Sequence, residues 1–184
     1  MTFASVPDLV LEPLLRNALM EDLGSYGDVT TRAVIPAGTR YDAHLNARED
    51  AIVSGMQVAE IAFRLVDPSL EVATLVHDGS VIAPGDTLMK IKGRAASILS
   101  GERVALNFAG RLSGIATKTA GFVAETKGTL TRVTCTRKTT PGWRGLEKYA
   151  VRCGGGSAHL ASPRPPVALD EPMYHIQKRG CRFP

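Results

Sequence analysis

The stretch that decides the fold covers residues 130–156 and reads LTRVTCTRKTTPGWRGLEKYAVRCGGG. It begins with the β-branched pattern of a strand, reaches a stop signal at Pro141-Gly142, and continues into a helix-forming segment. A strand, a turn and a helix in this order predict the start of a βα repeat. Arg137 and Lys138 follow the strand, and α/β enzymes bind anionic ligands at the C-terminal ends of strands. Two solvated cations beside a turn are the alternative.

The charge of the chain is divided unevenly. Residues 1–129 carry 12 Lys/Arg and 15 Asp/Glu, a net charge of −3, whereas residues 130–184 carry 10 and 3, a net charge of +7. A basic C-terminal third indicates anionic partners, which are small acids, phosphates or nucleic acid. We expect no nucleic-acid partner, because the aromatic residues that stack on bases make up only 5% of the chain and no binding motif is recognised.

The composition is that of a globular protein with one domain or two small ones, because 44% of the 184 residues are hydrophobic and 22% are charged. No apolar run approaches the roughly 18 residues of a membrane helix, so we expect no membrane partner. The N-terminus shows no secretory signal. Cys135, Cys153 and Cys181 are widely spaced and odd in number, which favours a reducing, cytoplasmic location over disulfides or a zinc site.

Residues 1–102 show the pattern of an α+β domain in which antiparallel hairpins have helices on one side. Pro13 interrupts the first predicted helix near its start. Asp28, Thr30 and Thr31 are suited to capping or turning the chain, a structural role. The predicted helices are 8–20 and 56–66, and the predicted strands are 41–54, 70–76, 79–83 and 87–93, with turns at 78–79 and 84–86.

The second half begins with a long helix over residues 95–126, which we expect to break or kink near Ser113-Gly114. Asn107 on its apolar face predicts a buried polar group that needs a hydrogen-bond partner. The glycine triplet at 154–156 favours a hinge, or backbone N–H groups that approach an anion. Five prolines fall among residues 160–184 without any helical or strand period, which predicts an irregular tail.

A set of motifs in a fixed order makes the chain resemble the quinolinate phosphoribosyltransferase family, also called nicotinate-nucleotide pyrophosphorylase (carboxylating). The resemblance covers about residues 8–159. Its motifs are EDLG (21–24), GDVTT (27–31), ARED (47–50), SG (54–55), DG (78–79), PGD (84–86), ERVALN (102–107), LSGIAT (112–117), TRKTTPG (136–142), LEKYAVR (146–152) and GGG (154–156).

The resemblance implies an α+β N-terminal sandwich domain followed by the start of an α/β barrel, here incomplete with about one βα unit. It also implies formation of nicotinate mononucleotide, pyrophosphate and CO2 from quinolinate and phosphoribosyl pyrophosphate, with Mg²⁺ present. The family acts as a dimer, so we expect a homodimer or higher homo-oligomer. The implied substrate-binding residues are Arg103, supplied by the neighbouring subunit, and Thr136, Arg137, Lys138 and His159; no catalytic residue and no metal ligand is implied.

These residue types suit the reaction. Quinolinate is a planar dianion, and a guanidinium can bind a carboxylate through two hydrogen bonds. Several convergent cations would hold the ring nitrogen toward the sugar carbon, which is catalysis by positioning. Charge that develops as pyrophosphate leaves would be stabilised by basic groups and magnesium.

The resemblance stops after His159, where Leu160 stands in place of an expected arginine and nothing in 160–184 matches the later barrel. Only 82 residues follow Glu102, whereas a complete barrel takes roughly 200. We therefore expect a truncated chain, inactive alone. Its expected units are an N-terminal sandwich over 1–102, a linker helix and first βα unit over 103–159, and an irregular tail over 160–184.

Two other functions remain open from the sequence. The first is a non-catalytic dimerisation or interaction fragment, because the N-terminal unit and the long helix could pair with a second chain. The second is the molybdenum-transport-associated relative of the family. Arg103, the TRKT motif and the LEKY motif follow the quinolinate pattern more closely.

Overall fold

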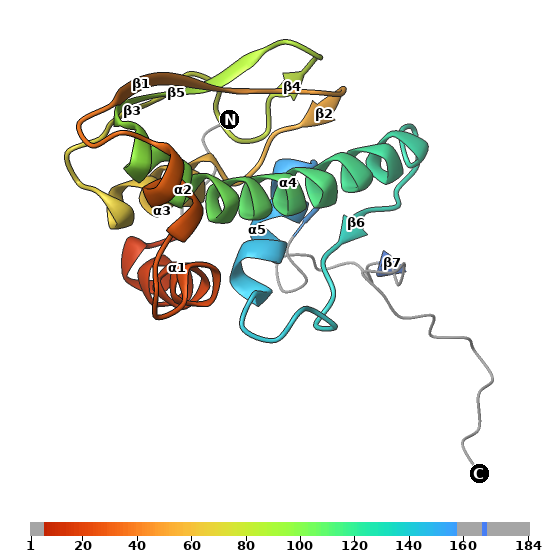
Figure 1. Ribbon diagram of the computed structural model, residues 1–184. Helices are drawn as coiled ribbons and strands as arrows, with labels where there is room; N and C mark the ends of the chain where they lie inside the picture. The colour runs from red at the N-terminus through yellow and green to blue at the C-terminus, as the bar shows by residue number, and fades with distance from the viewer. Residues whose placement is uncertain (1–5, 158–166, 169–184) are drawn as a thin grey trace.

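The computed structural model describes residues 6–157 and 167–168. A three-stranded antiparallel sheet with the order β1-β5-β3 covers one side of helices α3 and α4, and α1 and α5 contact their other sides (Figure 1). A two-stranded sheet joins β2 and β4. The elements are α1 (Asp8–Leu23), α2 (Val29–Val34), β1 (Arg40–Asn46), β2 (Ala51–Ile52), α3 (Met56–Val66), β3 (Glu71–Thr74), β4 (Val81–Ile82), β5 (Thr87–Arg94), α4 (Ala95–Glu125), β6 (Val133–Thr134), α5 (Arg144–Cys153) and β7 (Val167–Ala168).

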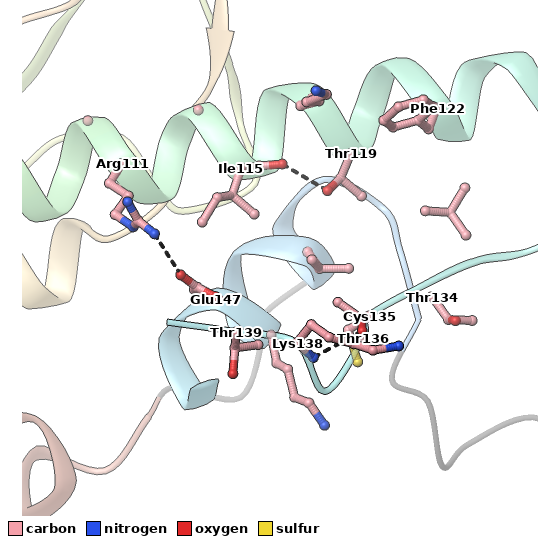
Figure 2. Close-up of a pocket in the computed structure, with 16 residues that line it drawn as sticks. Arg111, Ile115, Thr119, Phe122, Thr134, Cys135, Thr136, Lys138, Thr139 and Glu147 are labelled. Atoms are coloured by element: carbon pink, nitrogen blue, oxygen red, sulfur yellow. Dashed lines mark hydrogen bonds and ion pairs between the residues drawn. The ribbon is translucent and has the colours of Figure 1, made fainter. Parts of the chain in front are cut away.

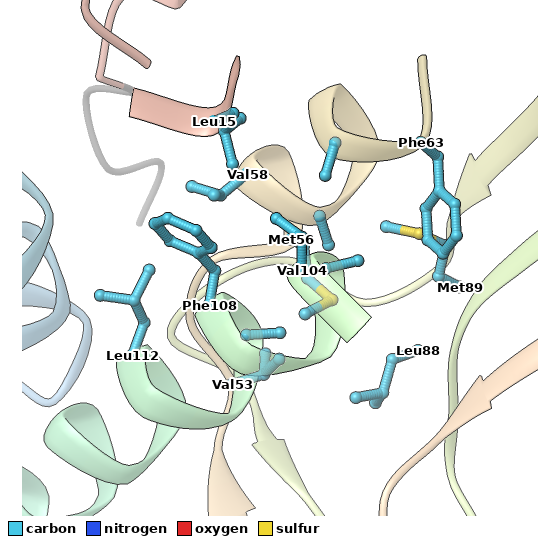
Figure 3. Packing of buried hydrophobic residues seen from close by; sticks show 14 of the residues in the cluster. Leu15, Val53, Met56, Val58, Phe63, Leu88, Met89, Val104, Phe108 and Leu112 are labelled. Carbon is cyan, nitrogen blue, oxygen red and sulfur yellow. The ribbon is translucent and has the colours of Figure 1, made fainter. Parts of the chain in front are cut away.

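The main hydrophobic core lies between the three-stranded sheet and the helices, as Figure 3 shows. Along β5 the buried Met89 and Ile91 alternate with the exposed Lys90 and Lys92, which is the period of a strand with one covered face. The helices contribute buried residues at three- and four-residue spacing, among them Leu11, Leu15 and Leu19 of α1, Met56, Ala59 and Phe63 of α3, and Val104, Phe108 and Leu112 of α4.

The first predicted helix forms, but Pro13 does not interrupt it. Helix α1 continues through the proline as far as Leu23. A proline at this position removes the hydrogen bond to the carbonyl of Leu9. Leu9 is 87% exposed, so water can replace the missing donor. The α1 helix therefore keeps Leu11, Leu15 and Leu19 on one continuous buried stripe.

The capping role predicted for the 28–31 segment is confirmed. The Thr31 backbone N–H donates to Asp28 Oδ1 at 2.9 Å, and the Thr31 hydroxyl donates to Asp28 Oδ2 at 2.7 Å. These bonds lower the pKa of the Asp28 carboxyl, and the nearby charge of Arg103 lowers it further. Asp28 is thereby fixed as an anion at the N-terminus of α2.

The predicted break in the long helix was wrong, because α4 is continuous over 31 residues. Two hydroxyl groups of α4 instead form hydrogen bonds with the backbone of the segment around β2 in the same chain. The N–H of Ile52 donates to Thr117 Oγ1 at 2.8 Å, and the N–H of Ser54 donates to Ser113 Oγ at 2.9 Å. Ser113 Oγ in turn donates to the Ser54 carbonyl at 3.1 Å. Ser113, which suggested a kink, therefore forms a tertiary contact with Ser54.

Asn107 was also predicted wrongly, since it is exposed rather than buried. At this point of α4, the buried residues are Val104, Ala105, Phe108 and Ala109. Asn107 lies outside that stripe and requires no buried partner.

The predicted strand, turn and helix are confirmed as β6, a connecting segment and α5. The strand ends at Thr134, however, well before Pro141. The described chain resumes as β7, which pairs in parallel with β6 and places Val133 opposite Val167. The sequence analysis predicted no strand after residue 160, and β7 corrects this; the rest of 160–184 lies outside the described residues.

The glycine triplet is neither a hinge nor an anion nest. Its N–H groups donate within the chain, from Gly154 to the Ala150 carbonyl and from Gly156 to the Val151 carbonyl. A Cβ added at Gly154 would lie 2.2 Å from the backbone oxygen of Ala116. The glycines are therefore required for close packing of the chain after α5 on α4.

Two buried polar clusters hold the layers together. The carboxyl of Asp67 accepts hydrogen bonds from Ser69, Ser97 and Arg94, and these bonds lower its pKa strongly. The Tyr149 hydroxyl donates to Asp78 at 2.9 Å, which links α5 to the N-terminal unit. Burial, together with the charge of Asp78, raises the pKa of Tyr149 above its usual value. No helix among the described residues is long and apolar enough to cross a membrane.

Candidate anion-binding site

A cavity of about 280 Å³ lies between α4, the end of β6 and α5 (Figure 2). Its volume is near the lower end of the range for small-molecule sites, roughly 300–1,000 Å³. The segment that forms its outer wall follows β6 and is called here the basic loop (residues 135–143). The cavity therefore lies where the sequence predicted anion binding, at the C-terminal end of the strand.

One face of α4 forms the inner wall. Arg111, Ile115, Lys118 and Phe122 line the cavity at three- and four-residue spacing, which places them on one side of the helix. Ile115 is buried, whereas Arg111 and Lys118 are exposed. This wall combines the apolar side chains of Ile115 and Phe122 with two cations.

The first residues of the basic loop line the cavity with one exception. Thr136 and Lys138 line it, and Arg137 between them is exposed and does not. The N–H of Lys138 donates to Thr136 Oγ1 at 3.1 Å, which keeps the two residues close. Three of the predicted site residues are therefore adjacent in the structure, and two of them face the cavity.

A buried carboxylate closes the cavity at the α5 end. Glu147 is 4% exposed, and a buried carboxylate requires hydrogen-bond partners. Arg111 Nη2 donates to Glu147 Oε1 at 3.0 Å, and the N–H of Thr140 donates to Glu147 Oε2 at 3.2 Å. Arg111 Nη2 also donates to Thr140 Oγ1 at 2.6 Å. Figure 2 shows the Arg111–Glu147 pair bridging α4 and α5.

The charge lining the cavity is positive. Arg111, Lys118, Lys138 and Lys148 contribute four cations, and Glu147 is the one carboxylate among the lining residues. The lining therefore carries three more cations than carboxylates. A small cavity with an apolar floor and excess positive charge is suited to a small organic anion.

Arg103 lies elsewhere on α4. Eight residues of helix separate it from Arg111, about 12 Å along the axis, and it does not line the cavity. Its Nε lies 3.0 Å from both carboxylate oxygens of Asp22, and its Nη2 lies 3.5 Å from Asp28 Oδ2. These hydrogen bonds, above all those to Asp22, raise the pKa of Arg103. Within one chain, Arg103 and the basic loop are not brought together.

The remaining predicted site residue, His159, lies outside the described residues. The sequence reasoning missed Arg111, Lys118, Glu147 and Lys148. A signal for Glu147 was present, because it stands in the apolar stripe that α5 buries through Leu146, Ala150 and Cys153. A charged residue on a buried stripe indicates a paired group.

The described residues contain no group of three or more His, Cys, Asp or Glu side chains that could hold a metal ion. They therefore do not fit a resident Mg²⁺ site. Mg²⁺ stays an expectation from the resemblance.

The chain matches two models of one family. Residues 28–113 match the quinolinate phosphoribosyl transferase N-terminal domain, and residues 115–164 match the C-terminal domain of the same family. The second match extends beyond His159, where the motif comparison stopped. The resemblance therefore reaches further along the chain than the motifs indicated.

Individual relatives agree with the family models. The chain is 43% identical over 153 residues to quinolinate phosphoribosyltransferase [decarboxylating] 2b, mitochondrial, of Nicotiana tabacum, covering 83% of this chain and 43% of that protein. It is 38% identical over 178 residues to the probable nicotinate-nucleotide pyrophosphorylase [carboxylating] of Synechocystis, covering 95% and 58%. The chain thus spans about half the length of the curated relatives it matches.

A solved structure shows the same architecture. NadC from Streptococcus pyogenes superimposes with a TM-score of 0.81 at 36% identity, covering 85% of this chain and 55% of that one. This confirms the predicted fold class, an α+β N-terminal unit followed by the beginning of an α/β barrel. Two domain models in the family order, together with close agreement in both sequence and structure, lead to one conclusion: the chain belongs to the quinolinate phosphoribosyltransferase family.

Proposed function

We propose that this chain supplies the quinolinate-binding part of a phosphoribosyltransferase. The reaction would join quinolinate to phosphoribosyl pyrophosphate and give nicotinate mononucleotide, pyrophosphate and CO2. The observation that carries the proposal is the cavity with four cations among its lining residues at the C-terminal end of β6, in a chain of this family. Relatives that it matches are named for this reaction.

Binding and orientation are the roles proposed for the loop residues. Lys138 would attract a carboxylate into the cavity, and Thr136 would hold the loop conformation through its bond to the Lys138 N–H. Arg137 would bind a second carboxylate from the rim, where its exposed guanidinium can turn toward the ligand. His159 would complete this set. Fixing the acid in one orientation places its ring nitrogen against the sugar carbon that it attacks.

A homodimer would bring Arg103 to the site. The support is its position, because Arg103 does not line the cavity of its own chain and forms ion pairs with Asp22 and Asp28 near α1 and α2. A second copy could place this exposed guanidinium beside the first copy's basic loop. Sedimentation equilibrium of wild type tests this part, and a monomer at high micromolar concentration would reject it.

The experiment for the whole proposal is a titration with quinolinate followed by ¹⁵N–¹H NMR. We expect shifts at Thr136 and Lys138 with a millimolar Kd, about −4 kcal/mol. Arg137→Ala and Lys138→Ala should each weaken binding. Lys127→Ala is the matched control, because Lys127 is exposed in the turn that follows α4 and its removal changes the net charge equally. Identical curves for all four proteins, or no shifts in wild type, would reject the proposal.

A further inference from the structure

We infer that Glu147 is a positioning residue of the carboxylate-binding site: with Arg111 it holds the basic loop in the conformation that binds the ligand. The inference rests on the proposed function for the identity of the ligand, a small aromatic dicarboxylate. Glu147 itself would touch no ligand. It acts through the loop that carries the cations.

The loop is fixed at both ends, and Glu147 fixes one of them. At the first end, the N–H of Cys135 donates to the Ser157 carbonyl at 3.1 Å. At the second end, Glu147 Oε2 accepts the Thr140 N–H at 3.2 Å. Residues 136–139, which include both loop cations, span the interval between these two anchors. Release of either anchor would let this short segment sample more conformations.

At the second anchor, Arg111, Glu147 and Thr140 are each hydrogen-bonded to the other two. Arg111 Nη2 lies 3.0 Å from Glu147 Oε1 and 2.6 Å from Thr140 Oγ1. The side chain of Glu147 is only 5% exposed, so water cannot readily replace a lost partner. Removal of the carboxylate charge would leave Arg111 and the Thr140 N–H competing for a single acceptor oxygen.

Aromatic packing ties the same end of the loop to α4. The Trp143 ring stacks on Phe108 with centroids 4.2 Å apart and planes 5° from parallel. The Arg111 guanidinium carbon lies 5.4 Å from the Trp143 centroid. Trp143 is the single tryptophan of the chain, so its fluorescence reports on this anchor without interference.

Positioning and simple electrostatics predict opposite effects for Glu147→Gln. The substitution makes the cavity more positive and frees Arg111 from its ion pair, so charge alone would tighten binding of a dianion. If Glu147 positions the loop, binding weakens in spite of the added positive charge. The sign of the change therefore separates the two accounts.

The experiment compares the full wild-type chain with Glu147→Gln, Thr140→Val and the charge control Glu125→Gln, since Glu125 is exposed at the end of α4. Quinolinate affinity is measured by NMR, and each variant is first checked by urea unfolding. We expect the Kd to rise about five- to tenfold for Glu147→Gln, which is about 1–1.4 kcal/mol, and less for Thr140→Val. The control should match wild type. The Trp143 emission should shift to longer wavelength in Glu147→Gln.

Two outcomes overturn the inference. Equal or tighter binding by a folded Glu147→Gln protein is the first. The second is a Thr140 amide that exchanges with solvent at the same rate in wild type and Glu147→Gln, which would show that the anchor does not hold the loop. If wild type binds no quinolinate, the proposed function fails, and the Thr140 exchange rates alone decide whether Glu147 positions the loop. If Glu147→Gln does not fold, Thr140→Val decides by the same two measurements.

Discussion

Replacement of Asp78 by alanine should weaken the contact between the N-terminal unit and α5 and destabilise the fold. Asp78 Oδ1 accepts the N–H of Met56 at 3.0 Å, and Asp78 Oδ2 accepts the N–H of Gly55 at 3.0 Å. These N–H groups stand at the N-terminus of α3. Asp78 Oδ2 also accepts the hydroxyl of Tyr149 at 2.9 Å. One side chain therefore caps a helix and joins two units of the fold.

The expected loss of stability follows from these three bonds. Loss of a helix N-terminal cap costs about 1 kcal/mol. Tyr149 is 8% exposed, and loss of the acceptor of a buried hydroxyl costs about 1–3 kcal/mol. We therefore expect Asp78→Ala to lower the free energy of unfolding by about 2–4 kcal/mol. Tyr149→Phe removes the bond to Asp78 and the contact of the hydroxyl with Cys153, but leaves the cap of α3 in place, and should cost about 1 kcal/mol.

Urea unfolding followed by circular dichroism measures these values, and the double variant completes a thermodynamic cycle. Because Tyr149→Phe removes the same hydrogen bond that Asp78→Ala breaks, the double variant should be less destabilised than the sum of the two single variants, with a coupling of about 1–2 kcal/mol. Asp86→Ala is the matched control, since Asp86 caps an exposed turn through one bond to the Ala83 N–H at 2.8 Å. Additive effects, or equal losses for Asp78→Ala and Asp86→Ala, would refute the reasoning.

Two further substitutions test the buried polar and glycine contacts. The pKa of Asp67 is lowered by hydrogen bonds, chiefly from Ser69 and also from Arg94. The contribution of this carboxylate to the free energy of unfolding is therefore fully present above about pH 4, and it is lost as the pH falls through the lowered pKa of the folded state. Asp67→Asn should therefore be less stable than wild type near neutral pH, with a difference in urea midpoint that shrinks below about pH 4; a constant difference would contradict this. Gly154→Ala should destabilise the fold by about 1–3 kcal/mol, because its Cβ would lie 2.2 Å from the Ala116 oxygen, and an unchanged thermal midpoint would exclude the clash.

Much of the N-terminal unit could be predicted from local patterns. The helix at 56–66 and the turns at 78–79 and 84–86 follow from hydrophobic period and from glycine placement, both of which are short-range properties. The errors arose where tertiary surroundings decide. Pro13 is tolerated in α1 because it leaves without a donor the carbonyl of Leu9, which is an exposed residue. No local pattern records which face of a helix becomes exposed.

The site was predictable in part. A strand followed by Arg137 and Lys138 located the basic loop, because the position of cations after a strand is visible in one short segment. The pairing of Arg111 with Glu147 was not, since 36 residues separate them and only the packing of α5 on α4 brings them together. The glycine triplet shows the same limit, because its close contact at Ala116 depends on a distant helix.

The hydroxyls of Ser113 and Thr117 have a consequence for the behaviour of the chain at high concentration. They occupy the N–H groups of Ser54 and Ile52, on the side of β2 that no strand of the two-stranded sheet covers. An open sheet edge is a template on which another polypeptide can add a strand, and such growth leads to aggregation. Here a helix closes that edge with side chains. The protein thereby guards a short strand against aggregation without lengthening the sheet.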